Sequence, residues 1–186
     1  ITGFAIVAGA RHNFWAGYAT KDLPPGKFEP VGLSFVGASL VSPNTMEATE
    51  HGLPKDIPLR PLFLADKPAG GKPDWTFNLL LKHGVRACLE YAKTFDLARA
   101  KALSNPDLSP HLEFLDLGGH GYAKVRLTSD EMRTEFVCIP RPITRAATPD
   151  GGPLRYRVAL TAPLWQSGQR PQLKTTVLEG DADVAR

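Results

Sequence analysis

Two nearly continuous apolar runs dominate the first part of the chain. Residues 2–9, TGFAIVAG, and residues 31–40, VGLSFVGASL, carry few polar side chains. Short apolar runs of this kind are typical of strands that are buried on both faces, as in a parallel or mixed sheet. Residues 20–30 lie between the runs and include Pro24 and Pro25, so this segment is predicted to be a loop.

Helical patterns occupy the middle of the chain. Residues 44–52, NTMEATEHG, predict a short helix with Asn44 as its N-cap. Between residues 74 and 104, apolar residues recur at intervals of three and four, which predicts one long amphipathic helix capped by Asp74. Gly84 lies inside this helix and costs about 1 kcal/mol relative to alanine.

After residue 110 the pattern changes to alternating apolar and polar positions. The segments HLEFLDL and GYAKVRLT lie on either side of a glycine-rich stretch and predict an antiparallel hairpin. Further strands are predicted in EMRTEFVCIP, LRYRVALT and QLKTTVLEG, and residues 181–186 are expected to fray. This order of elements predicts an α+β fold or a mixed sandwich, which is one domain or the second half of one.

Composition excludes few classes of function. Apolar residues make up 42% of the chain and charged residues 22%, as in ordinary globular proteins. The formal net charge is +3 and the basic residues are not clustered, so no nucleic-acid partner is indicated. The sequence contains no apolar run long enough to span a membrane and no recognisable signal peptide. Its abrupt apolar start suggests a piece of a longer protein or a chain cut after synthesis.

The two cysteines, Cys88 and Cys138, are too few for a disulfide framework or a zinc site built from cysteines. They are expected to be buried thiols rather than a bridge.

His12 is the strongest candidate for a functional residue. It follows a predicted strand, and ligands gather at the carboxyl ends of strands in open α/β sheets. A neutral imidazole can bind a transition metal, and an imidazolium can bind phosphate. The alternative is a structural histidine bonded to a loop carbonyl, and position alone does not separate the two.

Other polar residues near this position favour simpler interpretations. Asn13 is expected to cap a helix rather than to bind a ligand, and Arg11 to lie on the surface. His120 lies in a glycine-rich turn and is interpreted as part of that turn alone. The remaining histidines lie at no metal-ligand spacing: His51, His83 and His111.

The stretch GARHNFWAGYA, residues 9–19, resembles the C-terminal motif of the alkaline phosphatase D family, the PhoD-like metallophosphoesterases. That motif is typically Gly-Asp-x-His at the end of a sheet strand. Two further segments resemble the same family in the same order: FEPVGLSFVGASLVSP and NPDLSPHLEFLDLGGHGYAKVRLTSDEMRTEFVCI. The resemblance covers most of residues 3–140.

The resemblance implies the C-terminal half of a calcineurin-like metallophosphoesterase sandwich with flanking helices, followed by antiparallel strands. Residues 1–140 would be the C-terminal part of the phosphoesterase domain, and residues 141–186 its last strands and tail. Family members hydrolyse phosphomonoesters and phosphodiesters, many use iron with calcium, and they are exported to the periplasm or the cell surface. His12 corresponds to the motif histidine, which implies a catalytic and metal-binding role at the metal or phosphate site.

Two departures limit what the resemblance implies for this chain alone. The motif aspartate falls on Ala10, whose methyl group cannot coordinate a cation. The family's earlier Asp-Asp-His-Glu and Asp-Tyr motifs, which supply most metal ligands, are absent. The chain is therefore expected to hydrolyse phosphate esters only when combined with an N-terminal metal-binding part, its expected partner. The alternative is a non-catalytic pseudoenzyme or interaction module that keeps part of the fold.

Overall fold

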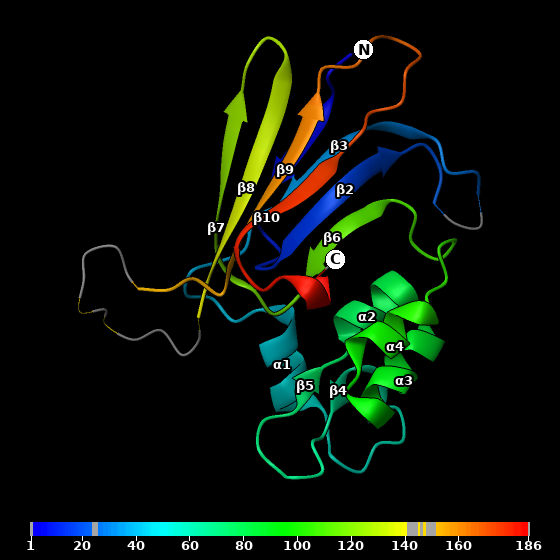
Figure 1. Cartoon of the computed structure of the whole chain (residues 1–186), viewed down its shortest axis with the longest axis vertical. Coiled ribbons are helices and arrows are strands. Elements are labelled where there is room, and N and C mark those ends of the chain that lie inside the picture. Colours follow the sequence, from blue (N-terminus) through cyan, green and yellow to red (C-terminus); the bar gives the residue numbers. More distant parts are fainter. Residues whose placement is uncertain (1, 24–25, 141–144, 146, 148–151, 186) are drawn as a thin grey trace.

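Two four-stranded sheets, a two-stranded sheet and a group of short helices make up the described part of the chain (Figure 1). It is a computed structural model and describes residues 2–23, 26–140, 145, 147 and 152–185. The expected α+β architecture is confirmed at this level. Within the predicted loop at 20–30, Pro24 and Pro25 lie outside the described residues.

The first sheet has the strand order β1-β3-β2-β6 and is mixed, as expected. β1 and β3 are parallel, and β2 is antiparallel to both β3 and β6. Consequently β1, β3 and β6 run in one direction, and their carboxyl ends meet at the same edge of the sheet. The bounds are Ala5–Ala8 for β1, Phe14–Thr20 for β2, Pro30–Val36 for β3 and Leu112–Asp116 for β6.

The expectation that residues 2–9 form a strand buried on both faces is wrong. β1 is the edge strand of its sheet, and Ile6 and Val7 are 46% and 54% exposed. An apolar run indicates that a strand can be buried. The rest of the fold decides how many layers and neighbouring strands cover it.

The second sheet is entirely antiparallel and has the order β10-β9-β8-β7. The predicted hairpin around residues 118–121 is wrong, because β6 pairs with β2 whereas β7 pairs with β8. The glycine-rich stretch instead carries the chain from one sheet to the other. The bounds are His120–Leu127 for β7, Glu131–Ile139 for β8, Tyr156–Pro163 for β9 and Lys174–Gly180 for β10.

Aromatic side chains from both sheets form the core between them. Phe14 of β2 and Phe114 of β6 face Phe136 of β8 and Tyr156 of β9, and all four side chains are buried. Their ring centroids lie 4.9–6.0 Å apart. Such tilted and edge-to-face pairs add to the stabilisation that burial of the rings supplies.

The short helix predicted at 44–52 is confirmed as α1, Thr45–Gly52. The Asn44 side chain accepts a hydrogen bond from the backbone N–H of Glu47, and the Glu47 carboxylate accepts one from the backbone N–H of Asn44. This reciprocal capping box is a local device. For that reason the sequence pattern alone was sufficient to place the helix.

The single long helix expected over 74–104 is wrong, because the chain forms three helices there. Gly84 has φ +94° and Phe95 has φ +56°, and neither conformation continues a right-handed helix. The helices are α2, Phe77–His83, α3, Val85–Thr94, and α4, Leu97–Ala102.

Asp74, the expected cap of that helix, instead lies in a small two-stranded sheet. It belongs to β5, Asp74–Trp75, which pairs with β4, Leu64–Ala65. A short 3₁₀ turn, η1, precedes this pair at Arg60–Leu62. None of the described helices is both long and apolar enough to cross a membrane.

The tail was expected to fray, but its described residues pack back onto the sheets. Ala182 and Ala185 are each 3% exposed and belong to the main apolar core. Ala182 precedes the 3₁₀ turn η2, Asp183–Ala185, and Ala185 ends it; this turn packs against β6 and α2. The small side chains of these two alanines permit the close approach to the core. Secondary-structure propensities do not indicate such packing.

Both cysteines are buried free thiols, as expected. Burial raises the pKa of each thiol to about 11, so the reactive thiolate is scarce near neutral pH. An aromatic disulfide reagent at about pH 8 is therefore expected to label neither thiol in the folded protein and both in denaturant. Rapid labelling of Cys88 in native buffer would contradict the burial seen here.

Candidate functional site

Polar side chains gather at the edge where the carboxyl ends of β1, β3 and β6 meet. The turn after β1 carries His12, the segment after β3 leads to Asn44, and the end of β6 carries Asp116. Ligands in open α/β sheets bind at this kind of edge. The position predicted for His12, just beyond a strand of a mixed sheet, is therefore where the fold places it.

His12 has two unusual features. Its φ is +55°, in the left-handed region that side chains other than glycine seldom adopt, at a cost of about 1–2 kcal/mol. Its Nδ1 lies 3.3 Å from the carbonyl oxygen of Pro43, just before α1. With Nδ1–H donating to that carbonyl, the tautomer leaves Nε2 as an acceptor. His12 as a catalytic or metal residue stays a prediction.

The residues beside His12 lie as follows. Arg11 is exposed, as expected. Asn13 does not cap a helix, because β2 begins at the next residue; its Nδ2 donates to the Thr45 hydroxyl at 3.2 Å. Asn13 is 4% exposed, and its Oδ1 has no hydrogen-bond partner among the described residues. The hydrogen bond from Asn13 to Thr45 therefore links the β1–β2 turn to the start of α1.

His120 is more than the turn residue that the sequence indicated, since its side chain is completely buried. Nε2 lies 2.8 Å from Asn44 Nδ2 and 3.0 Å from Glu47 Oε2, and Nδ1 lies 3.2 Å from the Ser39 carbonyl oxygen. The ring therefore joins β7 to the start of α1 and to the segment after β3. His12 and His120 contact the consecutive residues Pro43 and Asn44.

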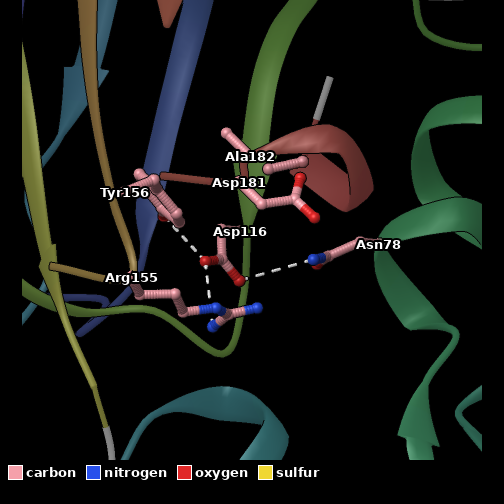
Figure 2. Close-up of a pocket in the computed structure, with 7 residues that line it drawn as sticks. Asn78, Asp116, Arg155, Tyr156, Asp181 and Ala182 are labelled. Carbon is pink, nitrogen blue, oxygen red and sulfur yellow. Dashed lines mark hydrogen bonds and ion pairs between the residues drawn. The ribbon is translucent and has the colours of Figure 1, made fainter. Parts of the chain in front are cut away.

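Asp116 is the centre of a second polar cluster, which Figure 2 shows. The carboxylate is 1% exposed and accepts hydrogen bonds from the Tyr156 hydroxyl at 2.7 Å and from the Gly118 N–H at 3.0 Å. Asn78 Nδ2 of α2 lies 3.4 Å from it, and Arg155 lies 3.5 Å away as an ion-pair partner. Burial, and then the charge of Asp116, raises the pKa of the Tyr156 phenol well above its ordinary value.

A hollow of about 270 Å³ lies beside this cluster and is lined by Asn78, Asp116, Arg155, Tyr156, Asp181, Ala182 and Ala185. Two carboxylates and one guanidinium line it, so its wall offers an anion no excess of positive charge. The Asp116 carboxylate already has several donors, as buried carboxylates require. The cluster is therefore a polar connection between β6, β9 and α2, and the geometry gives it no catalytic step.

The sequence did not single out this cluster, although one feature pointed to it. In HLEFLDL, Asp116 lies in an otherwise apolar stretch, and a carboxylate there requires partners. Those partners come from residues far along the chain.

The other histidines lie apart from the edge. His51 is exposed, His83 Nδ1 lies 2.8 Å from the Ser104 hydroxyl, and His111 is partly buried. Burial lowers the pKa of His111.

The polar side chains at this edge offer few donors to a metal ion. Among the described residues, no group of three or more His, Cys, Asp or Glu side chains could hold an ion. Ala10 contributes a methyl group beside His12, and Glu47 is already engaged by His120. The side chains of this part of the chain therefore do not fit the iron or calcium centre that the resemblance implies.

Comparisons with known proteins give one weak match. No protein-family model matches the chain, and no curated protein matches it. A solved structure entitled "Structure of PhoD" matches 95% of this chain at 16% sequence identity with a TM-score of 0.43. This chain covers 23% of that chain. A match at this level assigns neither a family nor an activity, and what is established is a mixed α+β fold with several sheets.

Proposed function

We propose that this chain is the C-terminal portion of a PhoD-like phosphoesterase, which hydrolyses phosphate esters together with an N-terminal portion that carries the metal ligands. The motif resemblance over residues 3–140 supports it. The single structural observation that carries it is the geometry of His12, which has a strained backbone and a ring anchored through Nδ1. Strain of this kind collects at functional sites.

The anchored ring suits two roles at a phosphate ester. A histidine that binds a metal through one nitrogen usually donates the other N–H to a carbonyl or carboxylate. A protonated imidazole can instead donate from Nε2 to a phosphoryl or leaving-group oxygen. The described side chains of this portion do not complete a metal centre by themselves, so the role that this chain's own residues support for His12 is positioning the ester or transferring a proton.

Substitution of His12 separates a role of its side chain in hydrolysis from a role in stability. His12→Asn keeps a residue that tolerates a left-handed backbone and removes the imidazole. Hydrolysis of bis(p-nitrophenyl) phosphate by the assembled protein is expected to fall by about 100-fold or more, with a change of less than about 1 kcal/mol in the free energy of unfolding. Urea denaturation and the phosphodiesterase assay measure the two quantities.

Two matched variants sharpen this result. His12→Gly is expected to lose activity equally while the backbone strain is relieved. Arg11→Ala, which removes an exposed neighbour, is expected to keep both activity and stability. A large loss of stability in His12→Asn with activity retained would make His12 a structural residue.

The whole proposal is tested on the protein purified under native conditions. Native mass spectrometry, metal analysis and phosphoester assays are made before any chains are separated. A second polypeptide bound to this chain, together with phosphoester hydrolysis, supports the proposal. A lone chain that folds cooperatively and hydrolyses none of the esters would instead favour the non-catalytic module.

A further inference from the structure

The His120 ring holds both ends of the loop at residues 39–44, which connects β3 to α1. Nδ1 lies 3.2 Å from the carbonyl oxygen of Ser39, and Nε2 lies 2.8 Å from Nδ2 of Asn44. The middle of this loop is open to solvent, since Val41 is 76% exposed. The buried ring therefore restrains the loop where it leaves β3 and where it enters α1.

The peptide group at the end of this loop contacts both His12 and Glu47. Its carbonyl oxygen, from Pro43, lies 3.3 Å from His12 Nδ1. Its N–H, from Asn44, donates to Glu47 Oε2 at 3.2 Å. Because the group is planar and rigid, its N–H and C=O reorient together. A change at the Glu47 carboxylate is therefore passed to the acceptor of His12.

Nε2 of His120 has two neighbours that one protonation state cannot satisfy. Asn44 Nδ2 is a donor and requires the lone pair of a neutral ring, whereas the Glu47 carboxylate, with Oε2 3.0 Å away, requires a protonated nitrogen. The Asn44 amide is fixed in its orientation, because Oδ1 accepts the N–H of Glu47 and Nδ2 also donates to the Gly118 carbonyl. Gain or loss of a proton therefore exchanges one contact for the other.

Among the described residues, Glu47 is the charged side chain in contact with the ring. It is 29% exposed, so a proton from solvent reaches the buried ring beside this carboxylate. Cys138 of β8 contacts the His120 backbone, and burial raises the pKa of its thiol to about 11, so it is neutral near pH 7. Asp116 and Arg155 act on that thiol and pair with each other at 3.5 Å. The proton on the ring therefore acts most directly on Glu47.

We propose that protonation of His120 controls how firmly His12 is held, through the Pro43–Asn44 peptide group. With a neutral ring, the Glu47 carboxylate stays on the peptide N–H, which strengthens the peptide carbonyl as an acceptor for His12. A protonated ring draws Glu47 Oε2 to its Nε2 and repels Asn44 Nδ2. The peptide group then rotates, and the contact with His12 is lost. This regulation deepens the proposed function and rests on it only for what His12 does.

NMR of isotope-labelled histidine and asparagine side chains measures the linkage in the protein purified under native conditions. The pH is lowered from about 9 to about 5, the range in which histidine titrates. The Asn44 side-chain amide and the tautomer ratio of His12 are expected to change with the same midpoint as the His120 ring. His120→Gln, whose amide does not titrate, is expected to remove this shared transition while His12 keeps its own.

Glu47→Gln tests the role of the charge and replaces a side chain that is partly exposed, so it decides the question even if His120→Gln does not fold. Glutamine at this position keeps the capping contact with the Asn44 N–H. The shared transition is expected to move to lower pH by about one unit, because the protonated ring loses its anionic partner. His51→Gln, which removes an exposed histidine from the same helix, is the matched control and is expected to leave the transition unchanged.

Three results would overturn the proposal. The His120 ring could keep one protonation state over the whole range, or the Asn44 and His12 signals could ignore its titration. The third is a midpoint that Glu47→Gln leaves in place.

Phosphoester assays separate this inference from the proposed function. In the assembled protein, the rate of ester hydrolysis is expected to fall on the acid side of the shared midpoint, and this fall is expected to move by about one pH unit in Glu47→Gln. Linked titration in a protein that hydrolyses no ester would retain the regulatory contact and reject the activity. Hydrolysis that depends on His12, with the same pH profile in the parent and in Glu47→Gln, would do the reverse.

Discussion

Replacing Asp116 with alanine is expected to lower the free energy of unfolding by about 3–5 kcal/mol. The substitution leaves the buried Tyr156 hydroxyl and the Gly118 N–H without their acceptor, and it leaves Arg155 without its ion-pair partner. Removal of one partner from a buried polar cluster costs more than the cluster contributes as a whole, because the remaining groups stay desolvated. Urea denaturation would measure the effect. The slope of the free energy of unfolding against urea concentration is expected to stay unchanged.

The matched control for this prediction is Asp181→Ala. Asp181 lines the same hollow but is exposed, and it accepts a hydrogen bond from the Asp183 N–H. Its removal is expected to cost less than about 1 kcal/mol. If Asp116→Ala proved as stable as the parent chain, the cluster could not be the connection between β6, β9 and α2 that its geometry indicates.

The second large effect is expected for Gly121→Ala, with a loss of about 3 kcal/mol or more. Gly121 has φ +149°, and a Cβ there would lie 1.9 Å from the Val137 carbonyl oxygen of the neighbouring strand. No rotation of a side chain relieves a clash with backbone, so β7 and β8 would have to separate. This would also disturb His120, the residue before it.

Gly9→Ala is the control for Gly121→Ala. A Cβ on Gly9 would meet nothing within 4 Å. This substitution is therefore expected to leave the thermal midpoint almost unchanged, while Gly121→Ala lowers it by about 6–12 °C or more. Equal behaviour of the two variants would mean that the β7–β8 pairing differs from the register described above.

The candidate site was only partly predictable from the sequence. His12 could be singled out because the apolar run before it marks the end of a strand, and the resemblance points to the same residue. His120 and Asp116 could not be, since their partners are distant in the sequence. The Asn44–His120 contact spans 76 residues and the Asp116–Tyr156 contact spans 40. No local pattern encodes such separations.

The sequence by itself determined the features that depend on near neighbours. These are the strands of both sheets except β2, which was not predicted from the sequence, together with α1 with its capping box and the presence of two buried thiols. Only the tertiary structure decided which strands pair, that β1 lies at an edge, that Gly84 and Phe95 divide a long amphipathic stretch into separate helices, and that the tail packs onto the core. The physical reason is that periodicity and caps act within a few residues, whereas pairing, burial and polar satisfaction depend on segments that folding alone brings together.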